Sequence, residues 1–405
     1  MKKFNKFLSV ALASAMVMAM AGCGNTDNGS AATGTNAATE NAAASDSAAS
    51  GSVFKIGGIG PTTGGAAVYG LAVQHGAEIA VEEINAAGGI NGYQVEFKFQ
   101  DDEADAEKSV NAYNALKDWG AQIIDGSTTS GACIAVTDKT KEDNMFQITP
   151  SGSAVECVQY DNNFRVCFSN PNQGLASAQY IGENGLAEKI AVIYDSSDVY
   201  SSGIYEKFVK EAENQPFEVV AAEAFTADNK TDFSVQLQKA KDAGADMVFL
   251  PIYYQESALI LTQAAAMGYA PKWFSCDGMD GILGGVDNFD VSLTEGVMLL
   301  TPFAADATDD LTQSFVTKYK EKYGETPNQF AADSYDAIYV IKAAIEKSGV
   351  TPDMSVSDIC DGMKAAMTEI TVDGLTGNGM TWTADGEANK APKAVVIENG
   401  AYKAM

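Results

Sequence analysis

The sequence predicts an α/β protein of two similar units, each with a parallel sheet that helices cover on both faces. From residue 53 onward, short apolar runs alternate with longer amphipathic segments. Short loops join them, as in repeated β-α units whose parallel strands need crossover helices. The alternation starts afresh after Asn170-Pro171, and 405 residues fit two domains better than one.

In the first unit, a strand over 53–60 leads through a glycine-rich loop into a helix that Gly88-Gly89 ends. Further strands are predicted at 93–100, 122–125 and 145–149, and the helices at 68–87, 105–119 and 132–142.

The second unit repeats the pattern. Its strands are predicted at 189–194, 217–224, 246–251, 273–276 and 296–301, and its helices at 173–183, 201–214, 232–243 and 256–267. Later segments could return to either unit: helices at 309–323, 329–348 and 356–367, and strands at 380–383 and 393–397.

The N-terminus has the pattern of an export signal. Lys2, Lys3 and Lys6 precede an apolar run over 7–20 that is too short to span a bilayer. The run ends in Met20-Ala21-Gly22-Cys23, which resembles the bacterial lipoprotein cleavage box; a plain secretory signal is the alternative. The resemblance implies that residues 1–22 are a lipoprotein signal peptide and that a lipid on Cys23 anchors the protein to the outer face of the cell membrane.

Residues 23–52 are almost entirely Ala, Ser, Thr, Gly and Asn, so we expect a flexible tether there. The net charge is −28, or −31 without Lys2, Lys3 and Lys6, which disfavours nucleic-acid partners.

No metal, cofactor or catalytic motif stands out. His75 is the only histidine and no C-x-x-C occurs, so we expect no metal site. The loop at 57–65 has the wrong glycine spacing for a dinucleotide, and Pro61 lacks a needed N–H. The acidic run 101–105 lacks the glycine of a calcium loop. Cys157 and Cys167 flank a loop and either pair or stay free; their spacing does not decide.

Small hydroxyl residues follow two predicted strands of the first unit. Thr129 and Ser130 precede a helix, and Ser151 and Ser153 follow the next strand. A helix N-terminus with nearby hydroxyls suits a carboxylate, although Ser130 as a helix cap and 151–153 as a turn are the simpler alternatives. Other strand ends carry Tyr69, Tyr200, Tyr253 and Asp277. Because ligands of parallel α/β sheets bind at the carboxyl ends of strands, we expect one shared cleft.

Several motifs together resemble the branched-chain amino acid binding proteins of ABC transporters, the Leu/Ile/Val type. The resemblance covers roughly residues 53 to 401. Its marks include Ile59-Gly-Pro-Thr-Thr-Gly64, Tyr69-Gly70, Gly88-Gly-Ile-Asn-Gly92, Asp101-Asp102, Ile148-Thr-Pro150 and Gly377-Asn-Gly379.

The resemblance implies the type I periplasmic binding protein fold, in which two Rossmann-like lobes are joined by several hinge crossings. Lobe I would then comprise 53–169 and 301–355, and lobe II 170–300 and 356–405. The resemblance also implies roles. Ser130, with Thr129 beside it, would bind a ligand carboxylate, and Ser151 and Ser153 would hold carboxylate and ammonium. Asp277, where relatives often have Glu, would face the ammonium, and Tyr69, Tyr200 and Tyr253 would close over the ligand.

From this resemblance we expect a monomeric, non-enzymatic receptor that needs no cofactor. It would capture an amino acid, branched-chain or otherwise apolar, and deliver it to an ABC importer permease. The alternatives are the same fold binding another small molecule, such as an amide, urea or aromatic acid, or a ligand-sensing module.

Overall fold

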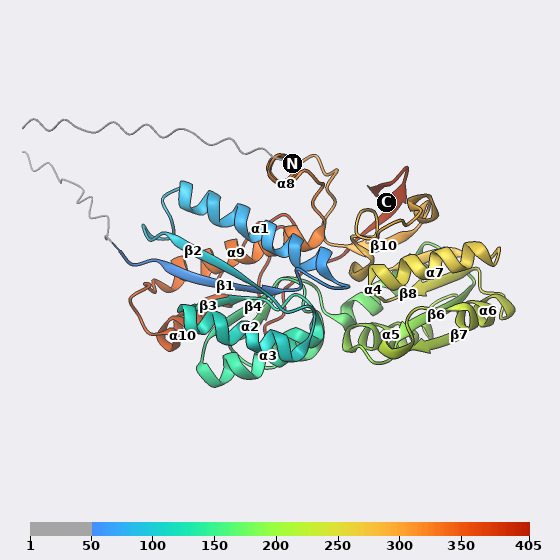
Figure 1. The fold of residues 1–405 in the computed structure, drawn as a ribbon, viewed down its shortest axis with the longest axis horizontal. Coiled ribbons are helices and arrows are strands. Elements are labelled where there is room, and N and C mark those ends of the chain that lie inside the picture. Colours follow the sequence, from blue (N-terminus) through green and yellow to red (C-terminus); the bar gives the residue numbers. More distant parts are fainter. Residues whose placement is uncertain (1–50) are drawn as a thin grey trace, which may run out of the picture. The chain divides into compact units, whose positions relative to one another are not determined.

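The computed structural model describes residues 51–405, all within one compact unit that is built on two sheets (Figure 1). The predicted signal peptide, the lipidation site at Cys23 and nearly all of the tether lie outside the described residues. We use lobe I for the five-stranded sheet with its helices and lobe II for the seven-stranded sheet with its helices.

The sheet of lobe I is wholly parallel, in the order β2-β1-β3-β4-β5. Strand β5 is not among the predicted strands, because its three residues are too few to show a pattern. The strands are β1 Phe54–Gly60, β2 Val95–Asp101, β3 Ile123–Asp125, β4 Phe146–Thr149 and β5 Asn163–Arg165.

Helices cover both faces of this sheet, with α1 and α9 on one face and α2 and α3 on the other (Figure 1). Residues at the helix termini set where these helices begin and stop. At the start of α2, the Asp105 side chain accepts hydrogen bonds from two backbone N–H groups, and Gly120, in the left-handed conformation, ends the helix. The helices are α1 Ala67–Ala86, α2 Ala106–Trp119, α3 Ser130–Asp143, α8 Asp310–Tyr323, α9 Gln329–Ser348 and α10 Val356–Met367.

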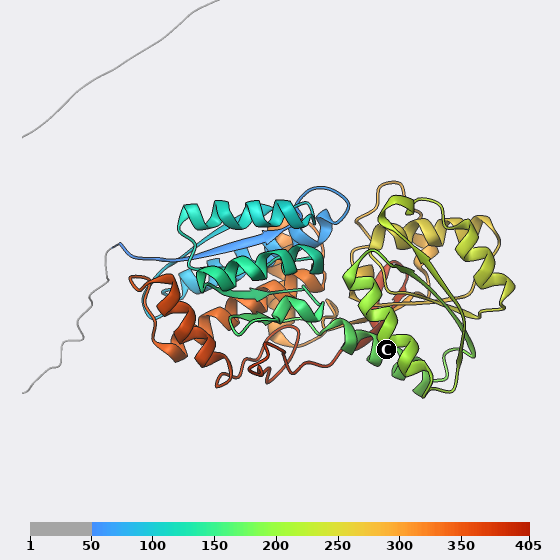
Figure 2. The same cartoon turned by 90° about the horizontal axis from the view of Figure 1, so that it is seen from below.

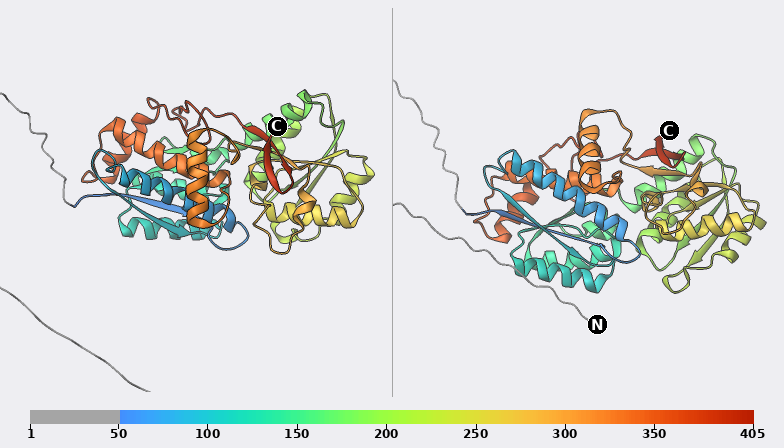
Figure 3. Two further views of the ribbon diagram at one scale, coloured as in Figure 1. Left: turned by 90° about the horizontal axis from the view of Figure 1, so that it is seen from above. Right: turned by 45° about the horizontal axis from the view of Figure 1, so that its top comes forward.

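The sheet of lobe II has the order β12-β11-β10-β9-β8-β6-β7. It is parallel from β7 to β10, whereas β11 and β12 pair antiparallel at the edge. These last strands lie beside the rest of the sheet (Figure 3). The strands are β6 Lys189–Asp195, β7 Glu218–Phe225, β8 Met247–Leu250, β9 Lys272–Ser275, β10 Met298–Thr301, β11 Lys393–Glu398 and β12 Ala401–Ala404.

Successive residues of the interior strand β6 face opposite sides of the sheet, as expected of a sheet buried on both sides. Ile190 and Val192 pack with α4 and α5, whereas Ala191 and Ile193 pack with α6 and α7. The helices of lobe II are α4 Asn170–Glu183, α5 Val199–Ala212, α6 Ser234–Asp242 and α7 Tyr254–Ala266, with short 3₁₀ turns at Ala227–Asn229, Asp277–Met279 and Val291–Thr294; the 3₁₀ turn Val155–Val158 belongs to lobe I.

The chain passes between the lobes after β5, after β10 and before β11. The expected return to lobe II at residue 356 comes too early. Helix α10 packs on α9 and β4 of lobe I, because its apolar face finds cover there (Figure 2). The Asn144 amide donates to the Ser357 hydroxyl at 2.7 Å, and the Trp382 indole donates to the Arg165 carbonyl at 2.8 Å. Of this tail, β11 and β12 join the second sheet.

Candidate functional site

The hydroxyl residues after β3 and β4 lie together. Thr129 is the N-cap of α3, so Ser130 is the first helical residue rather than the cap. The Ser130 hydroxyl oxygen accepts the backbone N–H groups of Ser153 and Ala154, each at 3.1 Å. The Ser151 hydroxyl donates to the carbonyl of residue 128 at 2.6 Å. The two loops therefore hold each other in place.

This loop pair leaves polar groups unused. Thr129, Ser130, Ser151 and Ser153 are at most 6% exposed. Among the described residues, the hydroxyl oxygens of Thr129 and Ser153 have no hydrogen-bond partner. A buried hydroxyl without a partner is costly, so these atoms indicate that a ligand completes the site. The partial positive charge at the N-terminus of α3 favours an anionic ligand group.

Asp277 follows β9 at the facing sheet edge and is 5% exposed. Its carboxylate accepts hydrogen bonds from the Tyr200 hydroxyl at 2.6 Å and from the Gln173 amide at 2.9 Å. Burial raises the pKa of this carboxyl to about 7, although both hydrogen bonds act in the opposite direction. A cation beside Asp277 would offset the cost of burying the ionised carboxylate.

The three predicted tyrosines form one aromatic cluster. The rings of Tyr200 and Tyr253 stack with centroids 5.0 Å apart, and Tyr69 meets Tyr253 edge-on at 5.5 Å. The Tyr69 hydroxyl donates to the carbonyl of Gly278 and accepts the N–H of Tyr254 at 3.2 Å. Tyr69 belongs to α1 of lobe I and its partners belong to lobe II, so this cluster links the lobes.

The first turn of α4 connects the hydroxyl loops to Asp277. The Asn170 N–H donates to the Ser153 carbonyl at 2.8 Å, and Gln173, three residues on, bonds Asp277. From α9, the Gln329 amide donates to the Asp277 backbone carbonyl at 2.9 Å. Gln173 and Gln329 escaped the sequence reasoning. Nothing in the sequence marked Gln173, because β5, the strand before it, was not predicted either, and nothing marks Gln329.

Arg165 also escaped, although it is the only arginine in the sequence. It is 0% exposed and donates to the carbonyls of Gly152 and Ala154 at 3.2 and 2.9 Å. Its guanidinium also lies 3.4 Å from the Glu387 carboxylate. The side chain therefore fixes the loop that carries Ser153, and it places a buried positive charge beneath that loop.

Other sequence candidates have structural roles. Thr62 and Thr63 of the glycine-rich loop give their backbone N–H groups to Asp101, so that loop is tied to β2. His75 stacks on Tyr323 at 3.6 Å. Cys157 and Cys167 are buried free thiols and do not pair with each other.

Within residues 51–405, no group of three acidic, histidine or cysteine side chains could hold a metal ion. Nor does any helix of this part of the chain have the length and apolar content to cross a membrane.

The fold and this group of buried polar and aromatic residues define a two-lobed α/β solute-binding protein. The chain belongs to the periplasmic binding protein family, whose model matches residues 53–401.

Several known proteins are similar to this chain over most of its length. The Leu/Ile/Val-binding protein homolog 3 of Brucella melitensis is 30% identical over 300 residues, covering 74% of this chain and 80% of that protein. The crystal structure of LivJ from Streptococcus pneumoniae, a branched-chain amino acid transporter substrate binding protein in complex with isoleucine, is 28% identical. The match covers 87% of this chain and 98% of that chain, with a TM-score of 0.78. The leucine binding protein LivK from Thermotoga maritima is 27% identical, with the same coverage and a TM-score of 0.77.

Proposed function

We propose that the protein captures an α-amino acid with a branched or otherwise apolar side chain between its lobes and presents it to an ABC importer permease. The observation that carries the proposal is the pairing of unpartnered buried hydroxyls at the N-terminus of α3 with a buried carboxylate, Asp277, at the opposing sheet edge. An amino acid zwitterion supplies the missing charge at each end.

The carboxylate would bind at the Ser130 and Ser153 loops. Ser130 uses its oxygen as an acceptor, so its proton remains available to donate. Thr129 and Ser153 offer further hydroxyl donors. Backbone groups of the loop around Ser151 would also contact the ligand. Hydrogen bonds to a charged carboxylate in a site closed to water are stronger than neutral ones.

The ammonium would lie against Asp277, and the apolar side chain against the tyrosine cluster. Tyr200 already orients Asp277 through a hydrogen bond, so its ring position and the carboxylate position are linked. Burying a side chain of leucine size contributes roughly 1.5–3 kcal/mol. The similar proteins support this ligand class: one is named a Leu/Ile/Val-binding protein homolog, one was solved with isoleucine, and one is named a leucine binding protein.

Binding would stabilise the closed arrangement of the lobes, because the ligand contacts both of them. The closed surface would then be what the permease recognises. The lipid on Cys23 would keep the receptor at the membrane. Replacing Cys23 with alanine should release the protein into the medium, and retention at the membrane would contradict the anchor.

Isothermal titration with the twenty amino acids, after removal of co-purifying ligand, tests the assignment. Leucine, isoleucine or valine should bind, and leucinamide, which lacks the carboxylate, should bind much more weakly. Mass spectrometry of the protein as purified gives an independent readout. If no amino acid binds, and Asp277→Ala changes no binding, the proposal fails.

A further inference from the structure

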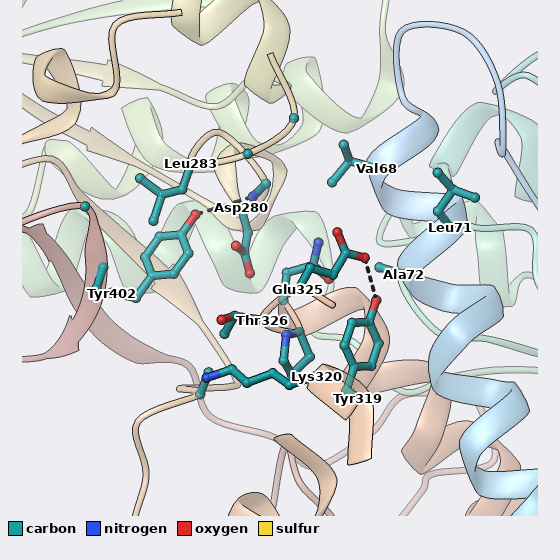
Figure 4. Close-up of a pocket in the computed structure, with 18 of the residues that line it drawn as sticks. Val68, Leu71, Ala72, Asp280, Leu283, Tyr319, Lys320, Glu325, Thr326 and Tyr402 are labelled. Atoms are coloured by element: carbon teal, nitrogen blue, oxygen red, sulfur yellow. Dashed lines mark hydrogen bonds between the residues drawn. The ribbon is translucent and has the colours of Figure 1, made fainter. Parts of the chain in front are cut away.

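A separate cavity of about 490 Å³ lies between α1 and α8 on one side and the loop 280–285 with residues 400–402 on the other (Figure 4). None of the eight predicted site residues lines it. Its walls come from both lobes. It is therefore distinct from the amino acid site, although it adjoins the same lobe junction.

Asp280 is the key group in this cavity. It is only 4% exposed, and Figure 4 shows its carboxylate pointing into the cavity between Tyr402 and Glu325. One carboxylate oxygen accepts the Gln329 N–H at 2.9 Å. The other has no partner in hydrogen-bond geometry among the described residues, although the Tyr402 hydroxyl and the Gly281 N–H lie near enough to lower the pKa of this carboxyl. A buried carboxylate left half-satisfied is destabilising, so a donor supplied from outside the chain would complete it.

The other residues that line the cavity indicate which charge and shape a ligand donor to Asp280 would have. Asp306 and Glu325 add negative charge, against one lysine, Lys320, so the cavity disfavours anions. Val68, Ala72 and Leu283 supply an apolar wall that a hydrated metal ion would not use. The rings of Tyr319 and Tyr402 border the same space and suit a cation.

We propose that this cavity is a second ligand site, which binds a primary ammonium ion carrying a short apolar group, with Asp280 as the acceptor. A primary ammonium offers three N–H donors, enough for the free oxygen of Asp280 and for a neighbouring acceptor. Its apolar group would cover the wall made by Val68, Ala72 and Leu283. Since the ligand needs no carboxylate, this site takes amines that the Ser130 loops would not retain.

Benzylamine is the probe, with benzyl alcohol as its uncharged counterpart, in titration calorimetry on the complete protein. Benzylamine should bind with one-to-one stoichiometry, and benzyl alcohol at least about tenfold more weakly, because it cannot form the charge-assisted hydrogen bond. Asp280→Asn should weaken benzylamine binding by about tenfold or more.

Gly284→Leu gives a second test that leaves Asp280 in place. Gly284 lines the cavity, a Cβ there would meet nothing within 4 Å, and its φ lies outside the left-handed region, so we expect a leucine to enter the cavity without backbone strain. This variant should lose benzylamine binding while retaining isoleucine binding and its melting temperature. Asp277→Asn, in the amino acid site, should leave benzylamine binding within about threefold of the parent.

Three results would overturn the proposal. The first is no benzylamine binding at millimolar concentration. The second is binding that survives both Asp280→Asn and Gly284→Leu. The third is binding that Asp277→Asn abolishes, which would place the amine in the amino acid cleft. The amino acid panel described above is scored separately, so the two proposals succeed or fail independently.

Discussion

Replacing Asp277 with asparagine removes the charge proposed to face the ligand ammonium while keeping the size of the side chain. The amide oxygen of the new side chain could still accept the Tyr200 hydroxyl, so the aromatic cluster should persist. The ammonium would lose its charged partner inside a closed site. Breaking a buried charge pair in this way costs about 3–5 kcal/mol, which corresponds to an affinity loss of roughly 100-fold or more.

The pKa of Asp277 adds a second, sharper expectation. Burial holds that pKa at about 7, so near neutral pH the ligand-free protein carries a mixture of protonated and ionised Asp277. The ammonium needs the ionised form. Affinity should therefore be highest above pH 8 and drop about tenfold for each pH unit below 7, with proton release on binding in that range. The asparagine variant should show neither effect.

Titration calorimetry with isoleucine between pH 5.5 and 8.5, in buffers of different ionisation enthalpy, measures both the affinity and the protons released. Ser153→Ala serves as a matched variant that weakens binding without a change in pH dependence. The role of Asp277 is refuted if the asparagine variant binds within about threefold of the parent, or if parental affinity is flat across this pH range.

Three further predictions follow from the site and the core. Ser153→Ala should weaken amino acid binding by about tenfold yet leave ligand-free stability unchanged or higher, since it removes a buried hydroxyl that has no protein partner; a lower ligand-free melting temperature would contradict this. Arg165→Lys keeps the charge but loses the fork that holds two carbonyls, so urea unfolding should show a loss of about 1–3 kcal/mol, together with weaker amino acid binding; parental values would exclude the loop-fixing role. Ligand-free stability should decline as pH rises from 5 to 8, which thermal melts measure. Burial raises the pKa of several carboxyls in the folded protein to about 6 or 7. Their contribution to the free energy of unfolding is complete below the unfolded pKa of about 3.9 and is lost as pH rises through 6–7. Melting temperatures that stay constant over this range would refute the prediction. The carboxyls concerned are Asp102, Asp125, Asp198, Asp277, Asp280 and Asp333.

Local sequence was enough to predict most of the helices and strands and the chemistry at the strand ends. The α/β alternation gave the two sheets, because period and loop length act over short distances. Ser130, Ser153 and Asp277 could be selected because parallel strands bring their carboxyl ends to one edge. Arg165 could also have been found, since a lone arginine in a chain with 54 acidic residues is conspicuous.

Tertiary packing decided the rest. Nothing local distinguishes α10 from a lobe II helix; its apolar face packs in lobe I because α9 and β4 offer the complementary surface. Strand β5, which is too short to show a pattern in the sequence, forms because β4 supplies its hydrogen bonds. The unpartnered oxygens of Ser153 and Asp280 are likewise a tertiary property. Sequence determines which polar groups a chain carries, whereas only the fold determines which of them are buried without a partner and so available to a ligand.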